Sequence, residues 1–306
     1  MQENEKQKIL KQVIFLNISL VAAEISAGVY SGSMALLADA LHNLGDVLAL
    51  IISLVALIYG TKKATDSMTF GYIKAEMMAA FLNALFLVVT MLFILAESLH
   101  RLFVPNEINA PIVIAASLIA LLINALSTWL LSQKNLEHHH HEHDDHHHHH
   151  EDMNIKAAYL HMLSDAALSL SVVVGGVVIY LFGIVVIDTL LSLLFSIYII
   201  KETLPLLRKS FFALMDANVD DIKEIEHLIL ASSEVVSIHD LHLHRPNSRE
   251  YYGSAHIVLQ EDFCLSQIEK ILEAIRERLH SAGVTHFVLQ PESTKYNLKT
   301  GCCSMH

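Results

Sequence analysis

The chain has 306 residues, 53% of them hydrophobic, and its mean hydropathy of +0.45 excludes an ordinary soluble domain. Its apolar residues lie in long blocks, and about 20 apolar residues in a helix span a bilayer. The formal net charge of −12 argues against a nucleic-acid partner.

Six apolar blocks follow one another, and each is long enough for a membrane-spanning helix. They predict a transmembrane domain over 11–204, preceded by an N-terminal arm at 1–10. We expect no cleavable signal peptide, because the arm runs into the first block without a small-residue cleavage site. The predicted helices are 11–31, 34–60, 73–100, 110–132, 155–181 and 184–204.

Lysine and arginine residues gather in the arm, in the loops after the second and fourth helices, and after the sixth helix. The loops after the odd-numbered helices offer mainly Arg101. The positive-inside rule therefore predicts that both termini and the loop at 134–153 face the cytosol. We expect a multi-pass protein of a bacterial inner membrane, because the chain is short.

The composition changes to that of a soluble domain over 217–306, after a linker at 205–216. Periodicity predicts helices at 220–232 and 265–280, with strands at 235–244, 251–260 and 285–293. The order αββαβ predicts a small two-layer α/β domain with its helices on one face of a sheet.

The second and fifth predicted helices each carry a histidine and an aspartate four residues apart, His42 with Asp46 and His161 with Asp165. This spacing puts both side chains of a pair on one helical face. Two imidazoles and two carboxylates suffice for a tetrahedral Zn²⁺ site, and ionisable residues in hydrocarbon mark transport paths. Polar pairs that hydrogen-bond neighbouring helices are the alternative, and they account poorly for two copies.

Four further acidic residues interrupt the apolar blocks. Asp39 falls near the face of His42, so it is a candidate partner that orients this imidazole, or else a packing carboxylate. We read Glu24, Glu97 and Asp188 as structural or supporting groups rather than as metal ligands.

Ten histidines crowd the loop between the fourth and fifth helices, where the sequence HHHHEHDDHHHHHED occupies 138–152. Such a tract cannot pack a core, and neutral imidazoles bind Zn²⁺, Ni²⁺, Cu²⁺ and Co²⁺. We expect a disordered loop that captures metal weakly, with an inert linker as the alternative. The histidines are His138, His139, His140, His141, His143, His146, His147, His148, His149 and His150.

The first predicted strand of the C-terminal domain carries His239, His242 and His244, whose side chains are expected to share one face. Strand pairing would bring His256 beside His239 or His242, and Glu292 ends the last strand. This set predicts a cytosolic metal site, and a polar sheet face is the alternative.

The three cysteines, Cys264, Cys302 and Cys303, form no framework of spaced pairs, which indicates a reducing compartment. The tail GCCSMH offers two thiolates beside an imidazole. It is therefore a candidate metal ligand, although a redox or an incidental role fits the same pattern.

Taken together, several segments resemble the cation diffusion facilitator family, in its zinc-transporting branch of cobalt–zinc–cadmium resistance and zinc efflux proteins. The resemblance covers almost the whole chain. It implies a six-helix bundle, a dimer, Zn²⁺/H⁺ exchange and a ferredoxin-like cytosolic domain, which suits the αββαβ order. The segments are SGSMALLADALHNLGD (31–46), TFGYIKAEMMAAFLNALFL (69–87), AAYLHMLSD (157–165), IHDLHLH (238–244) and SAHIVLQ (254–260).

The resemblance also implies roles for individual residues. Metal bound in the cytosolic domain, at His239, His256 and Glu292, would bring two such domains together. The transport site of the family carries over to His42, Asp46, His161 and Asp165.

The chain departs from the family pattern in two places. It reads GYIKAE at 71–76 where relatives often read GYHRAE, which weighs against an extra metal site in that loop. It has His244 where relatives usually have a tryptophan in HDLHVW, which adds a ligand or changes the packing.

These features predict a zinc efflux transporter that exports cytosolic Zn²⁺, with Cd²⁺ or Co²⁺ as further cargo, in exchange for protons. It is expected to be no enzyme and to work as a homodimer in the lipid bilayer. A membrane-anchored metal sensor or sequestering protein without transport is the alternative. An importer of the same ion stays open, since spacing gives no direction. An ATP-driven pump is rejected, because no phosphate-cradling GxxxxGK[ST] loop is present.

Overall fold

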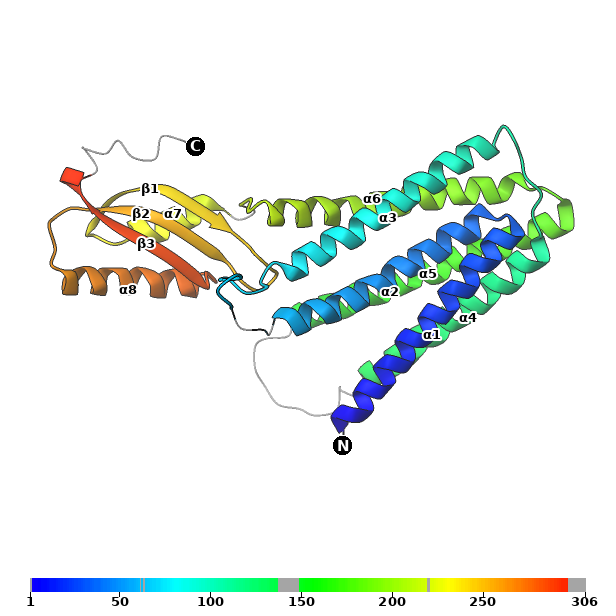
Figure 1. The fold of residues 1–306 in the computed structure, drawn as a ribbon, viewed down its shortest axis with the longest axis horizontal. Helices are drawn as coiled ribbons and strands as arrows, with labels where there is room; N and C mark the ends of the chain where they lie inside the picture. The colour runs from blue at the N-terminus through cyan, green and yellow to red at the C-terminus, as the bar shows by residue number, and fades with distance from the viewer. Residues whose placement is uncertain (1, 61, 63, 137–148, 219–220, 297–306) are drawn as a thin grey trace. The chain divides into compact units, whose positions relative to one another are not determined.

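The computed structural model describes residues 2–60, 62, 64–136, 149–218 and 221–296 (Figure 1). It contains two compact units, one formed by 1–51 with 83–205 and the other by 52–82 with 206–306. The first unit holds most of the apolar helices, and the second holds the α/β domain.

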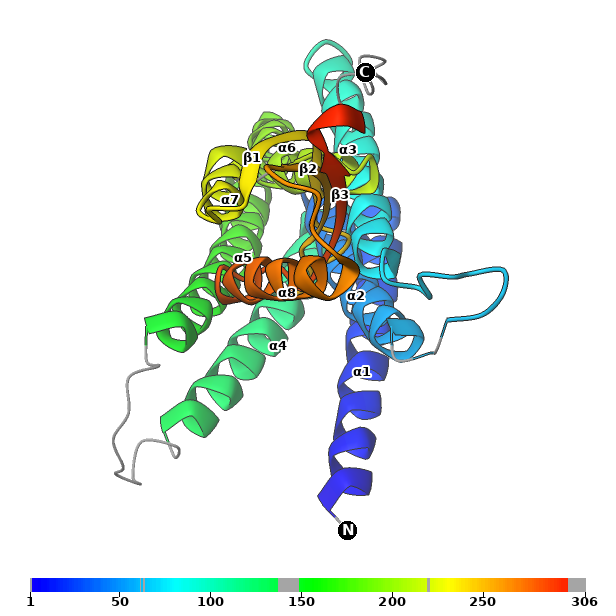
Figure 2. The ribbon, with the colours of Figure 1, turned by 90° about the vertical axis from the view of Figure 1, so that its left-hand side faces the viewer.

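Six long helices match the six predicted blocks in order. α4 and α5 pack along each other, and α1 packs against α4 (Figure 2). Within the described residues, three helical stretches are long and apolar enough to cross a membrane, namely Ala75–Arg101, Leu163–Phe182 and Val186–Leu214. The helices are α1 (Gln2–Ser31), α2 (Met34–Gly60), α3 (Ala75–Arg101), α4 (Ala110–Leu136), α5 (His149–Phe182) and α6 (Val186–Leu214).

The start of α2 is the centre of the helical core. Ala35, Leu36 and Ala38 are buried there against residues of α3, α4, α5 and α6. Small residues let helix backbones approach closely, which is how membrane helices gain packing contacts without a hydrophobic driving force. Gly45 continues this pattern, because a Cβ atom at this position would lie 2.3 Å from a methyl carbon of Leu87 in α3.

A carboxylate from α6 fixes the N-terminus of α2. Asp188 accepts hydrogen bonds from the hydroxyl of Ser33 and from the amides of Met34 at 2.8 Å and Ala35 at 3.4 Å. The Ser33 hydroxyl in turn accepts from the amide of Leu36 at 3.0 Å. These bonds satisfy amide groups that a helix leaves unpaired at its start. Asp188, which the sequence analysis interprets as a structural or supporting group, therefore positions α2.

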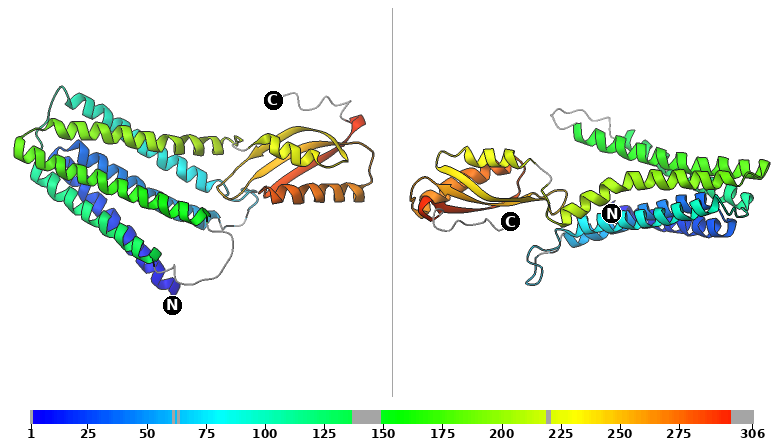
Figure 3. Two further views of the ribbon diagram at one scale, coloured as in Figure 1. Left: turned by 180° about the vertical axis from the view of Figure 1, so that it is seen from behind. Right: turned by 90° about the horizontal axis from the view of Figure 1, so that it is seen from above.

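The second unit contains the αββαβ order that the sequence predicts. Its sheet has the order β1-β2-β3, with β1 and β2 antiparallel and β2 and β3 parallel. Helices α7 and α8 cover the same face of the sheet (Figure 3). The elements are α7 (Ile222–Leu230), β1 (Val235–His244), β2 (Tyr252–Leu259), α8 (Leu265–Ser281) and β3 (His286–Ser293).

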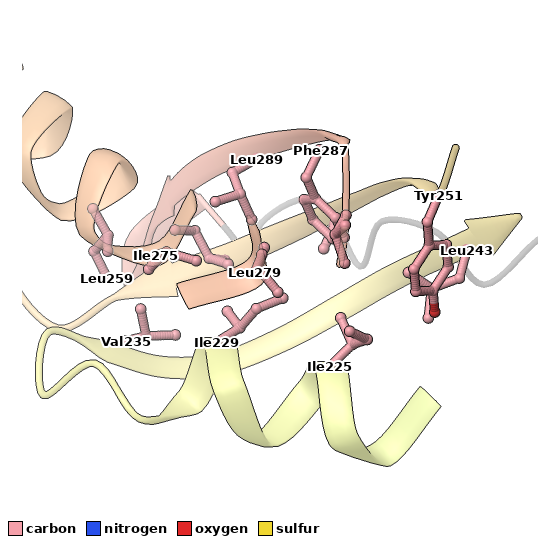
Figure 4. Packing of buried hydrophobic residues seen from close by; sticks show 13 residues of the cluster. Ile225, Ile229, Val235, Leu243, Tyr251, Leu259, Ile275, Leu279, Phe287 and Leu289 are labelled. Carbon is pink, nitrogen blue, oxygen red and sulfur yellow. The ribbon is translucent and has the colours of Figure 1, made fainter. Parts of the chain in front are cut away.

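The core of this domain lies between the helices and one face of the sheet (Figure 4). Ile225 and Ile229 of α7 and Ile275 and Leu279 of α8 pack against the sheet. Because successive strand residues point to opposite faces, burying Ile257 in this core puts its neighbours on the other side. That second face carries the histidines.

Most predicted boundaries agree with the structure to within two or three residues. The largest difference is at 205–216, which the composition sets apart as a linker but which is mostly helix, because α6 continues to Leu214. Pro205 lies inside α6, and the leucines, arginine and lysine that follow it are good helix formers.

Candidate metal centres

Three predicted ligands of the membrane site come together from two helices. His42 Nε2 lies 3.2 Å from Asp165 Oδ1 and 3.8 Å from Asp46 Oδ2. Metal–ligand distances of about 2.0–2.2 Å put the donor atoms of a tetrahedral zinc site roughly 3.4 Å apart. The observed spacings bracket this value, so the three donors can share one small cation without a large rearrangement.

The burial of the three side chains differs in a way that suits an accessible site. The side chain of His42 is 11% exposed, whereas those of Asp165 and Asp46 are 15% and 36% exposed. Ionised carboxylates are expensive inside an apolar bundle, and a divalent cation would offset both charges. The graded exposure leaves one flank of the cluster open to an entering ion.

A second contact between α2 and α5 supports the cluster. Asp39, buried one turn before His42, accepts a hydrogen bond of 2.9 Å from the hydroxyl of Ser169, one turn after Asp165. The sequence left open whether Asp39 orients His42 or is a packing carboxylate, and its hydrogen bond goes to Ser169 of α5. Asp39 therefore affects the zinc cluster indirectly, because its bond sets the distance between α2 and α5, the two helices that carry the ligands.

The remaining predicted ligands lie where the structure gives no side-chain description. His161 precedes Asp165 by one turn of α5, and its side chain lies outside the described residues. The side chains of the histidine-rich loop, His138 to His150, lie outside them too. So do Cys302 and Cys303 of the tail.

A second cluster lies on the histidine-bearing face of the sheet. His239 and His256 are direct partners in the β1–β2 ladder, and their ring centroids are 5.1 Å apart. Glu292 of β3 is 4% exposed, and its oxygens lie 2.9 Å from His256 Nδ1 and 3.4 Å from His239 Nε2. Gln290 also donates to Glu292 at 3.0 Å. The cluster offers a metal two imidazoles and one carboxylate.

A bulge in β1 explains why only one histidine of this strand joins the cluster. The register shifts between His239 and His242, and Asp240 in between has φ of +53°. Residues three apart lie on opposite faces of a regular strand, so the face that these two histidines share depends on the extra residue of the bulge. His242 contacts Asp240 at 3.0 Å instead of the cluster. His244 lies farther along, against the ring of Tyr252 at 5.8 Å.

Asp240 is a supporting residue that the sequence reasoning missed. One of its oxygens lies 3.6 Å from His256 Nε2, on the side of the ring away from Glu292. Carboxylates in this position fix the tautomer and orientation of a ligating imidazole. The signal in the sequence was an aspartate directly after His239, which alternation alone assigns to the face opposite this histidine.

Cys264 lies outside both clusters. It is an exposed free thiol, and its hydrogen bond with the hydroxyl of Ser266 at 3.2 Å lowers the pKa of the thiol. This makes the Cys264 thiol a reactive surface group, while the residue itself is the N-cap of α8.

Comparison with known proteins places the chain among relatives of similar length. A zinc transporter named ZitB from Yersinia pestis is 31% identical, and the match covers 95% of this chain and 89% of the relative. The metal cation efflux system protein CzcD of Cupriavidus metallidurans is 30% identical over 94% and 86% of the two chains. A cadmium, cobalt and zinc/H⁺–K⁺ antiporter of Bacillus subtilis is 28% identical over 97% and 94%.

Family models match almost the whole chain in the same order as its two parts. Residues 10–215 match the cation efflux transmembrane domain, and residues 217–293 match the cytoplasmic domain of cation efflux proteins. The helical bundle, the αββαβ domain and the resemblance read from the motifs agree with this assignment. The chain belongs to the cation efflux family, the cation diffusion facilitators.

Proposed function

We propose that this protein is a zinc efflux transporter that moves cytosolic Zn²⁺ across the membrane in exchange for protons, with Cd²⁺ and Co²⁺ as further cargo. The observation that carries the proposal is the cluster of His42, Asp46 and Asp165 between apolar helices. The names of the relatives, which include a cadmium, cobalt and zinc antiporter, a zinc transporter and a metal cation efflux protein, support it.

The donor atoms favour zinc over the abundant divalent cations. One imidazole nitrogen and two carboxylate oxygens form a mixed set that suits a small borderline ion. Ca²⁺ and Mg²⁺ prefer six or more oxygen ligands, which this cluster lacks. We assign the fourth position to His161, the second histidine of the repeated motif.

Proton exchange follows from the chemistry of the ligands. Histidine and carboxylate bind zinc only in their deprotonated forms, so metal binding and proton release are linked. A histidine with an ordinary pKa of about 6.5 changes protonation near neutral pH, which suits an exchanger. Zinc from the cytosol displaces protons, and protons from the other side help to eject zinc.

The assembly we propose is a homodimer in a bacterial inner membrane, with both termini in the cytosol. The cluster of His239, His256 and Glu292 would bind zinc in the cytosolic domain. It offers three donors for a tetrahedral ion, so one position stays open to water or to a second subunit. Metal binding there would draw two cytosolic domains together.

Zinc flux into proteoliposomes with an imposed pH gradient tests the proposal. We expect wild-type protein to take up zinc as protons leave the vesicles down their gradient. Asp46→Ala and Asp165→Ala should each reduce this uptake about tenfold or more, because each removes a ligand. Asp66→Asn, in the exposed loop between α2 and α3, is the matched control and should transport normally. Uptake by the two ligand variants at the wild-type rate would refute the proposed site.

A metal sensor that does not transport is the second candidate, and the cytosolic cluster favours it. Wild-type protein that binds zinc but shows no gradient-driven flux would point to this function.

A further inference from the structure

Glu24 is a buried acid that the proposed zinc site does not use. Its side chain is 1% exposed in the described bundle. Oε2 accepts a hydrogen bond of 3.2 Å from the side-chain amide of Asn43 in α2, and Oε1 has no hydrogen-bond partner among the described residues. A carboxylate held this way is costly in its charged form unless a cation or a proton joins it.

Glu24 lines a groove of about 400 Å³ between α1 and α4. The rest of the lining is alanine, leucine, isoleucine and proline, and α4 contributes only apolar side chains, among them Pro111 and Ile112. A dehydrated potassium ion needs a ring of oxygens, which these walls do not supply. A proton needs only the one carboxylate oxygen that is free, so a proton is the ligand that fits.

The groove runs along α4 from Ile119 to Pro111, close to the start of this helix. Pro111, in the first turn of α4, also lines a wider and more polar cavity of about 750 Å³ together with Tyr30, Glu107 and Asn109. Glu24 lies two helical turns, about 10 Å, before the end of α1 at Ser31. In the orientation proposed above, this end faces away from the cytosol, so water in the cavity can bring external protons to Glu24.

The contacts of Glu24 also connect it to the zinc site. Its partner Asn43 follows His42 directly on α2. The ionisable group that faces it from α2 is Asp39, whose Oδ1 also has no hydrogen-bond partner among the described residues. A Zn²⁺ ion at His42 therefore enters a poorly screened region that already holds two buried carboxyl groups. Its charge favours the ionised form of each.

We propose that Glu24 is a proton site of the exchange, separate from the zinc ligands. It takes a proton through the groove while the zinc site is empty. When Zn²⁺ binds, the O–H bond of the carboxyl breaks, the proton passes to water, and the carboxylate keeps the electron pair. This inference rests on the zinc–proton exchange proposed above.

Proton release on zinc binding tests the role of Glu24 without any transport. Purified full-length protein in detergent is titrated with ZnCl₂ in weak buffer, and a pH indicator counts the protons released per protein chain at zinc saturation. We expect Glu24→Gln to release about one proton fewer than wild type and to keep its zinc affinity within about threefold, since glutamine retains the bond to Asn43. Glu24→Asp, which keeps an acid, should restore the wild-type count.

Glu97→Gln is the matched control. Glu97 is also an acid of an apolar helix, but it forms an ion pair with Arg101 at 2.9 Å, so its removal should leave the count unchanged. Wild-type proton release from Glu24→Gln would overturn the proposal. Loss of zinc binding in Glu24→Gln would also overturn it, because Glu24 would then be a ligand or a structural group.

Flux measurements separate this inference from the function on which it rests. If wild-type protein shows no pH-driven zinc flux, the proposed zinc–proton exchange is refuted. The protons released on zinc binding can still be counted in that case. If Glu24→Gln loses only a potassium dependence of zinc flux, the groove belongs to K⁺, an ion in the name of one relative, and the proton assignment is overturned.

Discussion

At the scale of single residues, α2 reaches α5 through two contacts with different roles. His42 meets Asp165 in the zinc cluster, and Asp39 accepts a hydrogen bond from Ser169 one turn away. The first contact supplies donor atoms, and the second sets how far apart those donors stand. A ligand set spread over two helices is only as well defined as the spacing between these helices.

Removing the Ser169 hydroxyl should weaken zinc binding without touching a ligand. In Ser169→Ala, the buried carboxylate of Asp39 loses its bond, and we expect zinc affinity to fall about tenfold. Calorimetric titration of chains that also carry Glu292→Gln, so that the cytosolic cluster contributes little, measures this. Ser171→Ala is the control, because Ser171 is half-buried and its hydroxyl bonds a carbonyl of its own helix, that of Ala167. Equal affinities for both variants would contradict the role given to Asp39.

In the cytosolic cluster, Glu292 joins the two histidines. We expect Glu292→Gln to weaken cytosolic zinc binding at least about tenfold, because it replaces the one buried carboxylate that faces both imidazoles. The titration is done in chains that also carry Asp46→Ala, so that the membrane site does not contribute. Glu261→Gln, at an exposed position, serves as the reference and should bind like the parent chain.

At the scale of helices and strands, hydrophobic periodicity predicted most of the architecture, because apolar blocks and alternating strands follow directly from burial. It could not place Asp240, since a one-residue bulge changes which face a strand residue takes, and alternation assumes no bulge. It also could not tell that Asp39 would bond α5, because the partner of a buried acid depends on packing between distant segments.

The capping of α2 by Asp188 leads to a prediction about stability. In Asp188→Asn, a nitrogen donor replaces one of the two acceptor oxygens, so it faces the donor of either Ser33 or Met34. We expect the free energy of unfolding to fall by about 1.5–3 kcal/mol, the usual value of hydrogen bonds to a charged group. Thermal unfolding in detergent measures the loss. An unchanged Tm would mean that α2 does not need this cap.

At the scale of the whole molecule, the proposed function requires the α/β domain to face the cytosol. Cys264 offers a test, because its thiol is exposed and its pKa is lowered by Ser266. In cells that express Cys302→Ser/Cys303→Ser, a membrane-impermeant maleimide should label Cys264 only after the membrane is permeabilised. The parent chain with Cys264→Ser added controls for background labelling. Labelling of Cys264 in intact cells would contradict the proposed topology.

The close approach of Gly45 to Leu87 has a consequence for how such transporters diverge. A Cβ atom at position 45 would lie 2.3 Å from the Leu87 side chain, so any volume added to α2 here must be removed from α3. The two positions share one space one residue away from the ligand Asp46. In an alignment of relatives they should therefore change together, a larger residue at the first accompanied by a smaller one at the second.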